Sequence, residues 1–413
     1  MSEVPFGWSE AALGDVCKIV SGATPKTGVR SFWGGPIAWL TPNDMSRDRS
    51  QTLQGGDRSL THAGLASCST RLVPAGSVIV SSRAPIGYVA IAGREMCTNQ
   101  GCKTAIPPDF LDSKYLYWYL LAAKPDLDSR ASGTTFKEIS AKRFAETQIR
   151  WPGLSEQRRI VEIIEDHFSR LDAAANYASA AQQRTKTMVS SARQLLVAAA
   201  ACNSTTYTLG ELASVGTGTT PQRSEPRYYA GGNIPWITSG DLSQGDLLEA
   251  NRFVTDAALA ETSLKLYPTG TLLIAMYGEG KTRGTVAELG IPATTNQACA
   301  AVDVRDEALK PWIRLVLEAN YSALRRLAAG GVQPNLNLSL VRAIQIPIPD
   351  NADRERLMAS TTQVIGGASS IRGELEPFVD RVAKLRSAVF AAAFSGRLAG
   401  RSTDDEVIEE VAG

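Results

Sequence analysis

The chain has 413 residues, with 43 Lys and Arg against 42 Asp and Glu, and a formal net charge of +1 at pH 7. This length supports two or three domains, and the hydrophobic content of 44% is ordinary for a folded soluble protein. No apolar run approaches the roughly 18 residues of a membrane helix, and the start lacks a signal peptide, which predicts a cytoplasmic protein. The six cysteines follow no regular spacing, which predicts reduced thiols and no metal site.

The first predicted domain covers residues 1–152. Alternating apolar and polar residues lead to a Gly-Ala-Thr-Pro turn at 22–25, and then to an aromatic residue with a glycine pair at 33–35. A β-branched and apolar run predicts a strand at 76–81, and a helical stretch follows at Ser113–Ala123. We therefore expect a mixed α and β domain. Residues 1–150 have a net charge of +4.

A different pattern covers residues 153–203. Apolar and small residues repeat by seven for over 40 residues, with Ile164 and Ala178 in one series and Phe168 and Val189 in the other. This heptad seam predicts one long helix that requires a helical partner.

The third segment, 204–350, repeats the first. Leu13-Gly14 returns as Leu209-Gly210 at a displacement of 196, and Thr98-Asn99-Gln100 returns as Thr295-Asn296-Gln297 at a displacement of 197. A repeat of this length indicates two copies of one folded domain, because solenoid units have only about 20–50 residues. The copy includes a strand at 270–275 and a helix predicted at Lys310–Arg326. Two similar domains imply two similar sites.

Heptads return over residues 351–399 and predict a second long helix. The simplest arrangement pairs it with the first helix in antiparallel orientation, which would bring the carboxyl-terminal part of the chain beside the start of the first copy. Two unrelated helices that each cap their own domain are the alternative. Gly366-Gly367 and Pro377 weaken the second helix, so we expect a kink or break near Glu376.

The last stretch, 400–413, contains five acidic residues and is expected to be mobile or to bind a partner. Residues 350–413 carry a net charge of −3. This uneven but weak charge balance predicts that any DNA affinity is shared with a partner protein, since proteins that neutralise many phosphates alone are more basic.

Catalytic motifs are missing from the sequence. The stretch Ala275–Thr282 ends like a phosphate-binding loop but has alanine where the first glycine is required. The Asn-Pro-Pro-aromatic and Asp-Pro-Pro-aromatic tetrapeptides of amino-group methylation do not occur. These observations favour a protein that catalyses nothing. A nucleotide-dependent enzyme and a scaffold that does not read DNA are the competing classes.

The order of several short motifs resembles the specificity subunit of type I restriction-modification systems. In chain order these motifs are Trp8 with Leu13-Gly14-Asp15, the Gly-x-Thr-Pro turn, Trp33-Gly34-Gly35 with Trp39, Thr98-Asn99-Gln100, the Trp151–Ile160 start of the central helix, and Ala391–Leu398. The resemblance covers nearly the whole chain. It implies an α+β fold of two tandem mixed α/β target recognition domains, each followed by a long helix, with the helices forming an antiparallel coiled coil in a pseudo-twofold, circular layout.

The resemblance also implies a role in phage defence. Each domain would read one half of a bipartite site in double-stranded DNA, and the paired helices would set the distance between the two half-sites. Two methylation subunits that bind S-adenosylmethionine would dock on the chain, and restriction subunits that use ATP and Mg can join them. The chain itself would bind no cofactor and have no catalytic residue.

Loops that differ between the two copies are where different bases would be read, by polar or basic side chains. For each candidate, a solvated surface charge or loop cap is an equally good interpretation. Trp39 and Trp236 are expected in the core, and Thr98-Asn99-Gln100 is expected to tie a loop through hydrogen bonds. Asp44 and Asp241 are expected to cap turns. The DNA-contact candidates are Lys26, Arg30, Asn43, Arg83, Lys137, Arg223, Arg227, Lys281, Arg283, Gln333 and Asn335.

Overall fold

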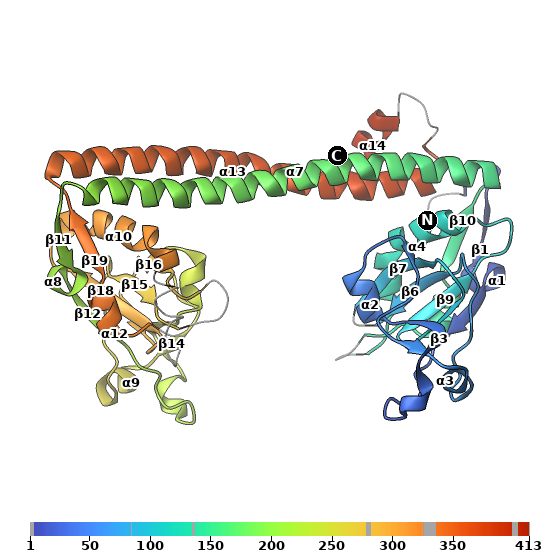
Figure 1. Cartoon of the computed structure of the whole chain (residues 1–413), viewed down its shortest axis with the longest axis horizontal. Coiled ribbons are helices and arrows are strands. Elements are labelled where there is room, and N and C mark those ends of the chain that lie inside the picture. The colour runs from blue at the N-terminus through green and yellow to red at the C-terminus, as the bar shows by residue number, and fades with distance from the viewer. Residues whose placement is uncertain are drawn as a thin grey trace. The chain divides into compact units, whose positions relative to one another are not determined.

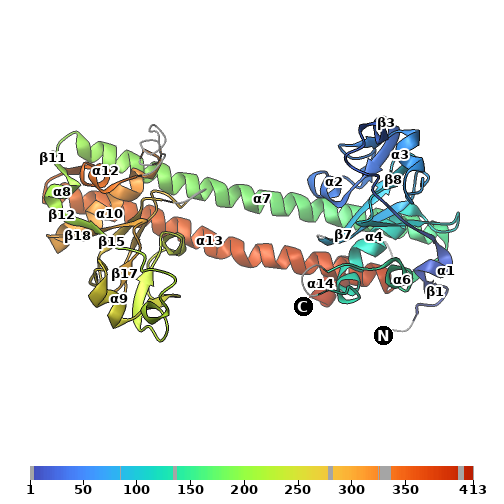
Figure 2. The same ribbon diagram turned by 90° about the horizontal axis from the view of Figure 1, so that it is seen from below.

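The structure is a computed structural model that describes residues 4–83, 85–133, 137–277, 282–323, 325, 336–398 and 404–412. Its internal contacts divide the chain into two compact units. Unit 1 contains Met1–Ala178 and Glu376–Gly413, and unit 2 contains Ser179–Leu375. Each unit combines one mixed α and β domain with a segment of each of two long helices (Figures 1 and 2). The α+β class with two tandem domains, each followed by a long helix, is therefore confirmed.

The domain of unit 1 is built on a five-stranded sheet with the order β2-β9-β6-β7-β4. The apolar run that predicted a strand forms β6, and all five of its residues are buried. A second sheet has the order β5-β3-β8, and β1 pairs with β10. The strands are β1 (Ser9–Ala12), β2 (Lys18–Ser21), β3 (Trp33–Leu40), β4 (Thr52–Leu53), β5 (Ser59–Leu60), β6 (Val78–Ser82), β7 (Ile86–Ala92), β8 (Met96–Thr98), β9 (Cys102–Ile106) and β10 (Gln148–Trp151).

Helix α4 (Ser113–Ala122) connects the sheet of unit 1 to the long helices, and its prediction from the sequence is confirmed. It packs against β6 and β7. On another face, the Trp118 ring lies 5.0 Å from Phe168 and 6.0 Å from Phe390, which belong to the two long helices. The shorter helices of unit 1 are α1 (Leu13–Val16), η1 (Arg30–Phe32), α2 (Pro42–Arg47), α3 (His62–Ala66), α5 (Lys124–Ser129) and α6 (Ala141–Ala145).

Unit 2 repeats this plan. Its sheets have the orders β12-β18-β15-β16 and β14-β13-β17, and β11 pairs with β19. The register is also repeated, because Leu40 pairs with Thr98 in unit 1 and Ile237 pairs with Thr295 in unit 2. The strands are β11 (Thr205–Thr208), β12 (Ala213–Thr217), β13 (Ile234–Ile237), β14 (Phe253–Val254), β15 (Leu272–Ala275), β16 (Val286–Glu288), β17 (Thr294–Thr295), β18 (Cys299–Val304) and β19 (Gln345–Ile348).

Helix α10 (Lys310–Ala319) is the counterpart of α4. It ends at Asn320, whose conformation is not helical, and helical residues resume at 321–323 and at 325, so most of the described part of the predicted stretch to Arg326 is helical. Trp312 is buried in the core of unit 2 and donates a hydrogen bond of 2.7 Å from Nε1 to the Pro347 carbonyl. The other helices are α8 (Leu209–Leu212), η2 (Pro226–Tyr228), η3 (Asp241–Gln244), α9 (Asp256–Glu261), η4 (Glu307–Leu309) and α12 (Leu338–Arg342).

The two heptad segments form α7 (Leu154–Ala201) and α13 (Asn351–Phe394), drawn in green and red in Figure 1. In unit 1 they pack in antiparallel orientation, because Phe168 and Phe390 have ring centroids 4.9 Å apart and Asp172 forms an ion pair with Arg386. In unit 2, Val197 of α7 and Leu357 of α13 share one core. The antiparallel pairing is confirmed, and the alternative of two unrelated capping helices is wrong.

Helix α13 is continuous through Pro377, so a break near Glu376 is wrong, while the other expected outcome, a kink there, stays a prediction. The proline removes one backbone hydrogen bond, but packing on both sides of it holds the helix. Ala368 and Val382 are both less than one tenth exposed to solvent. The boundary between the two units falls beside this proline, between Leu375 and Glu376.

The acidic end of the chain also differs from expectation. Asp404–Ala412 forms the helix α14, whose Ile408 is buried in the core cluster of unit 1. This helix differs from the expected mobile tail, because apolar side chains between the acidic ones give it a face to bury, and the other expectation, that the segment binds a partner, stays a prediction. As predicted, the carboxyl-terminal part of α13 returns to the start of the first copy. A Cβ on Gly396 would lie 3.0 Å from Pro5.

Candidate nucleic-acid interface

The Gly-x-Thr-Pro turn of each unit is held by the Thr-Asn-Gln motif. In unit 2, Thr220 Oγ1 donates a hydrogen bond of 2.6 Å to Gln297 Oε1, and Thr24 bonds Gln100 in the same way in unit 1. The turn lies so close to the motif that a Cβ on Gly218 would be 1.7 Å from the Thr295 carbonyl oxygen. The predicted role of the Thr-Asn-Gln motif in tying a loop is confirmed. We call this arrangement the turn brace.

Both repeated tryptophans lie in the core, as predicted. Trp39 is 4% exposed and Trp236 is 7% exposed. The indole N–H of each donates a hydrogen bond of 3.2 Å to a carbonyl of the turn, at Ala23 in unit 1 and at Thr219 in unit 2. Each tryptophan therefore holds the turn through a hydrogen bond from its buried ring.

The two repeated aspartates cap turns, as predicted. Asp44 Oδ2 accepts a hydrogen bond of 2.9 Å from the Thr41 amide at the start of α2. Asp241 Oδ2 accepts one of 2.8 Å from the Thr238 amide at the start of η3. Such caps fix the direction of the chain where it leaves the sheet.

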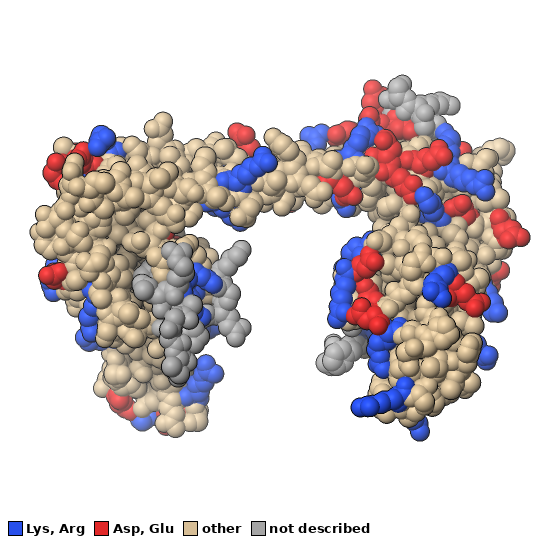
Figure 3. Space-filling view, viewed as in Figure 1, with Lys and Arg blue, Asp and Glu red and all other residues tan. Residues whose placement is uncertain are grey.

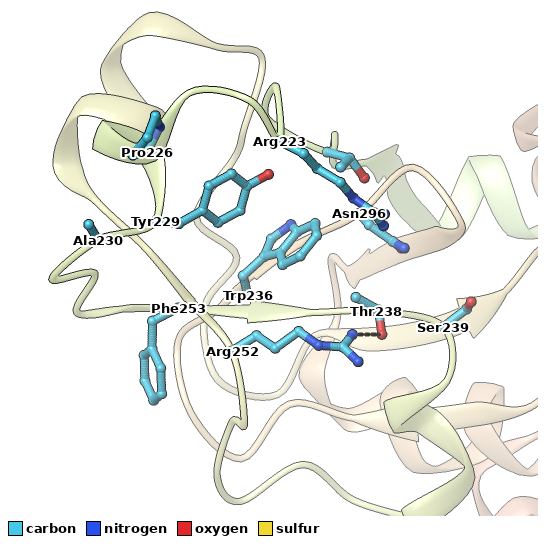
Figure 4. A pocket seen from close by; sticks show the side chains of 11 residues that line it. Arg223, Pro226, Tyr229, Ala230, Trp236, Thr238, Ser239, Arg252, Phe253 and Asn296 are labelled. Carbon is cyan, nitrogen blue, oxygen red and sulfur yellow. Dashed lines mark hydrogen bonds between the residues drawn. The ribbon is translucent and has the colours of Figure 1, made fainter. Parts of the chain in front are cut away.

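Unit 2 contains a cavity of about 970 Å³ between the turn, η2 and the sheet β14-β13-β17 (Figure 4). Its walls are aromatic and its polar groups are arginines, hydroxyls and one amide. In the view of Figure 4, the Trp236 ring lies between the side chains of Arg223 and Arg252. The lining residues are Thr220, Arg223, Pro226, Tyr229, Ala230, Trp236, Thr238, Ser239, Arg252, Phe253 and Asn296.

Two contacts fix the polar groups of this cavity. Arg252 Nη1 donates a hydrogen bond of 2.8 Å to Thr238 Oγ1. The hydroxyl of Tyr229 donates one of 2.5 Å to the Pro221 carbonyl, and burial raises the pKa of Tyr229. The phenol is therefore neutral near pH 7. A cavity with neutral aromatic walls and guanidinium groups has the chemistry to hold nucleotide bases and phosphates.

Unit 1 carries a related pair of side chains. Trp33 stands where unit 2 has Tyr229, and its ring meets the Trp39 ring edge-on at 5.0 Å. The guanidinium of Arg58 lies 3.3 Å from the centroid of the Trp33 ring. Arg58 precedes β5 as Arg252 precedes β14. Both units therefore place an arginine beside the aromatic residues that follow the turn.

Sequence reasoning missed Arg58 and Arg252. The sequence does contain the repeat that relates them. Arg252 follows Arg58 by 194 residues, and Phe253 follows Ser59 by the same 194 residues. That displacement differs from the 196 and 197 of the stronger motifs, so the shorter connection in unit 2 hid the match. An alignment that allowed this gap would have found both arginines.

The unit 1 candidates fall into two groups. Lys26 and Arg30 are exposed on the turn and η1, next to Trp33, whose Nε1 donates a hydrogen bond of 3.4 Å to the Lys26 carbonyl. Arg83 belongs to the second group, which lies beside the start of α2. Pro42 of α2 and Arg83 both lie next to Gly101, since a Cβ on Gly101 would be 3.0 Å from Pro42 and 3.1 Å from Arg83. The exposed candidate Asn43 follows Pro42 in α2.

Arg83 is also part of an ionic network. Its guanidinium lies 3.9 Å from Glu138, and the buried Lys103 lies 3.7 Å from the same carboxylate. Burial lowers the pKa of Lys103, while Glu138 acts in the opposite direction. Lys137 is exposed beside this network. The charge of Arg83 is therefore partly neutralised within the unit.

The DNA-contact candidates of unit 2 lie in several separate places. Arg223 is exposed and lines the cavity. Arg227 forms an ion pair of 2.8 Å with Glu261, so its charge is already partnered. Arg283 is half-buried beyond β15. Lys281, Gln333 and Asn335 lie outside the described residues, as does part of the loop that resembles a phosphate-binding motif.

Figure 3 shows how charge is distributed on one face. Basic and acidic side chains are mixed over the helical part of unit 1, whereas blue side chains predominate at the end of its domain away from the helices. Basic character is thus local, in agreement with the small net charge of the chain. A nucleic acid would find phosphate partners there without a strongly basic protein.

Metal and membrane features are limited in the part of the chain that the structure describes. There, no group of three or more His, Cys, Asp or Glu side chains could hold a metal ion. Over the same residues, no helix is both long and apolar enough to cross a bilayer. Burial raises the pKa of Cys97 to about 11 and that of Cys102 to about 12, so these thiols stay protonated near pH 7.

The chain matches a family described as "Type I restriction modification DNA specificity domain" over residues 5–177 and again over 203–363. It is 27% identical over 324 residues to the type I restriction enzyme MjaIX specificity subunit of Methanocaldococcus jannaschii. The aligned region covers 73% of this chain and 74% of the relative. It is 29% identical over 166 residues to the type I restriction enzyme EcoR124I/EcoR124II specificity subunit of Escherichia coli, covering 38% of this chain and 40% of the relative.

Solved structures share the fold. A chain reported under "Structural basis underlying complex assembly and conformational transition of the type I R-M system" superposes with a TM-score of 0.75 at 18% identity, over 96% of this chain and 100% of the other. The HsdS subunit of Thermoanaerobacter tengcongensis gives a TM-score of 0.53 at 18% identity, over 96% and 99% of the two chains. At this identity the likeness shows the fold alone.

Proposed function

The chain belongs to the type I restriction-modification DNA specificity family, and on this premise we propose that it reads a bipartite target in double-stranded DNA, one half-site per domain. We assign residues 1–152 and 204–350 to the reading domains, and residues 153–203 and 351–399 to the spacer segments that contain α7 and α13. The observation that carries the proposal is the repeated pairing of an arginine with aromatic residues beside the turn brace, at Arg58 and at Arg252.

The chemistry of these two positions suits base reading. A guanidinium can donate two hydrogen bonds to guanine in the major groove, whereas Asn and Gln suit adenine. The side chains around the two arginines differ between the units, since Trp33 and Ser59 in unit 1 correspond to Tyr229 and Phe253 in unit 2. One scaffold with two different sets of walls is suited to reading two different half-sites.

The other DNA-contact candidates differ in how well their surroundings suit a contact with DNA. Exposed Lys26, Arg30 and Arg223 lie beside Trp33 or in the cavity, which favours contacts with bases or nearby phosphates. Arg83 and Arg227 are held by carboxylates, so they suit phosphate contacts that compete with an ion pair. Asn43, Lys137, Lys281, Arg283, Gln333 and Asn335 remain candidates from the sequence.

Catalysis is assigned to partner proteins. Two methylation subunits would bring S-adenosylmethionine, and restriction subunits would bring ATP and Mg, while this cytoplasmic chain selects the site. The modest positive charge supports such sharing, because the partners would supply much of the affinity for the DNA backbone.

The test is methylome sequencing of cells that carry this chain with and without its cognate methylation subunit. We expect a new bipartite methylated motif that requires both proteins. The purified complex should then bind a duplex with that motif more tightly than duplexes altered in either half. An assembled complex that methylates no motif and binds all duplexes equally would instead identify a scaffold that does not read DNA.

A further inference from the structure

Unit 2 has a second cavity, of about 560 Å³, between its domain and the long helices (Figure 1). Its walls come from α7, α13, the segment that contains β16, and the end of α10. All of these wall segments belong to unit 2, so the cavity is complete within one unit. We call this cavity the helix pocket.

The charged side chains of the helix pocket are mostly basic. Lys186 and Arg193 come from α7, and Arg372 comes from α13. Among the described residues of the lining, Glu318 is the single acidic one, and its carboxylate lies 2.7 Å from Arg193 Nη2. Three basic groups against one carboxylate leave the pocket with a positive charge, which favours an anion.

Several donors of the helix pocket lack an acceptor. Lys186 and Arg372 are exposed at the rim, and neither forms a hydrogen bond or ion pair with another residue in the described ranges. Arg193 is half-buried, and its buried Nε–H finds no acceptor within those ranges either. A buried donor without a partner is rare in a folded protein, and one explanation is a bound ion or ligand.

In unit 1 the corresponding position is filled by aromatic rings. The long helices repeat at a displacement of 197 residues, so Arg193 corresponds to Phe390 and Ile365 corresponds to Phe168. The two phenylalanine rings lie 4.9 Å apart, and Trp118 lies 5.0 Å from Phe168. The shared scaffold therefore does not require a cation at this position. In unit 2 the aromatic packing is replaced by a cavity with basic walls.

The lining suits a phosphate group. A guanidinium offers a planar fork of donors that matches phosphate oxygens, and a lysine adds a mobile point charge. The hydroxyls of Ser190 and Ser369 also line the pocket and can donate hydrogen bonds. The volume lies within the roughly 300–1,000 Å³ that is usual for small-molecule sites.

We propose that the helix pocket of unit 2 binds a phosphate group, carried either by a molecule of nucleotide size or by the backbone of DNA. Lys186 and Arg372 contact the phosphate from the rim, and Arg193 contacts it from inside. The site is distinct from the cavity beside Trp236, which lies against η2 and the sheet β14-β13-β17. Only the DNA source rests on the proposed function.

The first experiment titrates inorganic pyrophosphate into the full-length chain by isothermal titration calorimetry at constant ionic strength. We expect saturable binding. The pocket variant, Lys186→Gln with Arg372→Gln, should bind at least ten-fold more weakly. The control variant, Arg184→Gln with Arg356→Gln, loses the same charge from exposed residues of α7 and α13 outside the lining, and should bind like the original chain.

The second experiment identifies the source of the phosphate. The complex with the cognate methylation subunit is titrated with duplex DNA at several salt concentrations. If the DNA backbone enters the pocket, the pocket variant should bind every duplex more weakly than the control variant, and its salt slope should be smaller by about 2. If a free molecule enters it, the two variants should bind duplexes alike and differ only with pyrophosphate. Either result supports the pocket.

The proposal is overturned if the pocket variant and the control variant do not differ in either experiment. Its failure is separate from that of the proposed function, because pyrophosphate binding does not require that the chain reads DNA. Pyrophosphate binding that the pocket variant loses, without any methylated motif, would leave the pocket standing and refute the reading function. A methylated motif with two variants that behave alike would do the reverse.

Discussion

The guanidinium carbon of Arg58 lies 3.3 Å from the centroid of the Trp33 ring. Stacking fixes the plane of the guanidinium and directs its N–H groups away from the ring. Arg58→Ala should therefore weaken binding of a cognate duplex by about 1–3 kcal/mol, roughly 5- to 150-fold. Arg58→Lys should not restore affinity, because an ammonium group neither stacks nor donates two parallel hydrogen bonds.

The control for this prediction is Arg356→Ala, an exposed arginine on α13. Dissociation constants are measured with duplexes altered in one half-site at a time. The Arg58→Ala protein should lose discrimination in one half and keep it in the other. Equal losses on every duplex would show that Arg58 contacts only the DNA backbone.

Arg252→Ala is the matched change in unit 2. Its hydrogen bond to Thr238 holds the guanidinium in the cavity, so removal should cost about 1–3 kcal/mol in duplex affinity and relax discrimination in the other half-site. The combined Arg58→Ala and Arg252→Ala protein should lose discrimination in both halves, with the two effects additive because the sites share no residues. If both single variants affect the same half-site, the assignment of one half-site to each domain is wrong.

The turn brace predicts a change in stability. Thr220→Val removes the hydroxyl that donates to Gln297 and keeps the shape of the side chain. The free energy of unfolding, measured in urea, should fall by about 0.5–1.5 kcal/mol. Thr24→Val should have a similar effect on unit 1, and Thr362→Val, which changes an exposed residue of α13, serves as the control. If the free energy of unfolding falls no more than it does in the control, the turn brace does not stabilise the fold.

The unbroken helix α13 predicts that Pro377 costs stability. Pro377 is exposed, so Pro377→Ala should raise the free energy of unfolding by up to about 3 kcal/mol. Gly366→Ala should raise it by about 1 kcal/mol, because a Cβ there meets no atom within 4 Å. Both changes are measured by chemical denaturation. A decrease in either variant would mean that the helix needs local flexibility at that point.

His167 predicts a loss of stability in acid. Burial lowers its pKa, the Arg170 charge lowers it further, and Asp405 acts in the opposite direction. The unfolded chain therefore takes up a proton near the ordinary pKa of 6.5, while the folded chain resists protonation. The stabilisation is complete above pH 6.5 and is lost as the pH falls below it.

The measurement compares melting temperatures at about pH 7.5 and about pH 5.5 for the original chain and for His167→Gln. Glutamine cannot titrate, so the variant should lose less stability on acidification. If both proteins lose the same amount, other groups dominate the acid response.

Much of this fold could be predicted from the sequence. The displacement of 196 or 197 residues located two copies of one domain, and heptads located both long helices, because periodic burial leaves a periodic pattern. Pro377 and the acidic end were misjudged for the same reason. Local propensity favours a break and disorder there, but packing against other helices outweighs it.

The site was harder to predict than the fold. Lys26, Arg30 and Arg223 lie near the aromatic residues, whereas Arg58 and Arg252 escaped notice because a gap in the repeat separates them from the stronger motifs. Ion pairs could not be foreseen either, since Glu261 is 34 residues from Arg227. Contacts between distant segments become visible only once the chain is folded.

The turn brace also bears on how such a protein can change over generations. Its hydrogen-bonding residues are the same in both domains, while the walls beside it differ. The side chains beside the brace can therefore differ between the two domains while the brace keeps the same hydrogen bond. Over generations the chemistry of this surface could change while the hydrogen bond that holds the turn is kept.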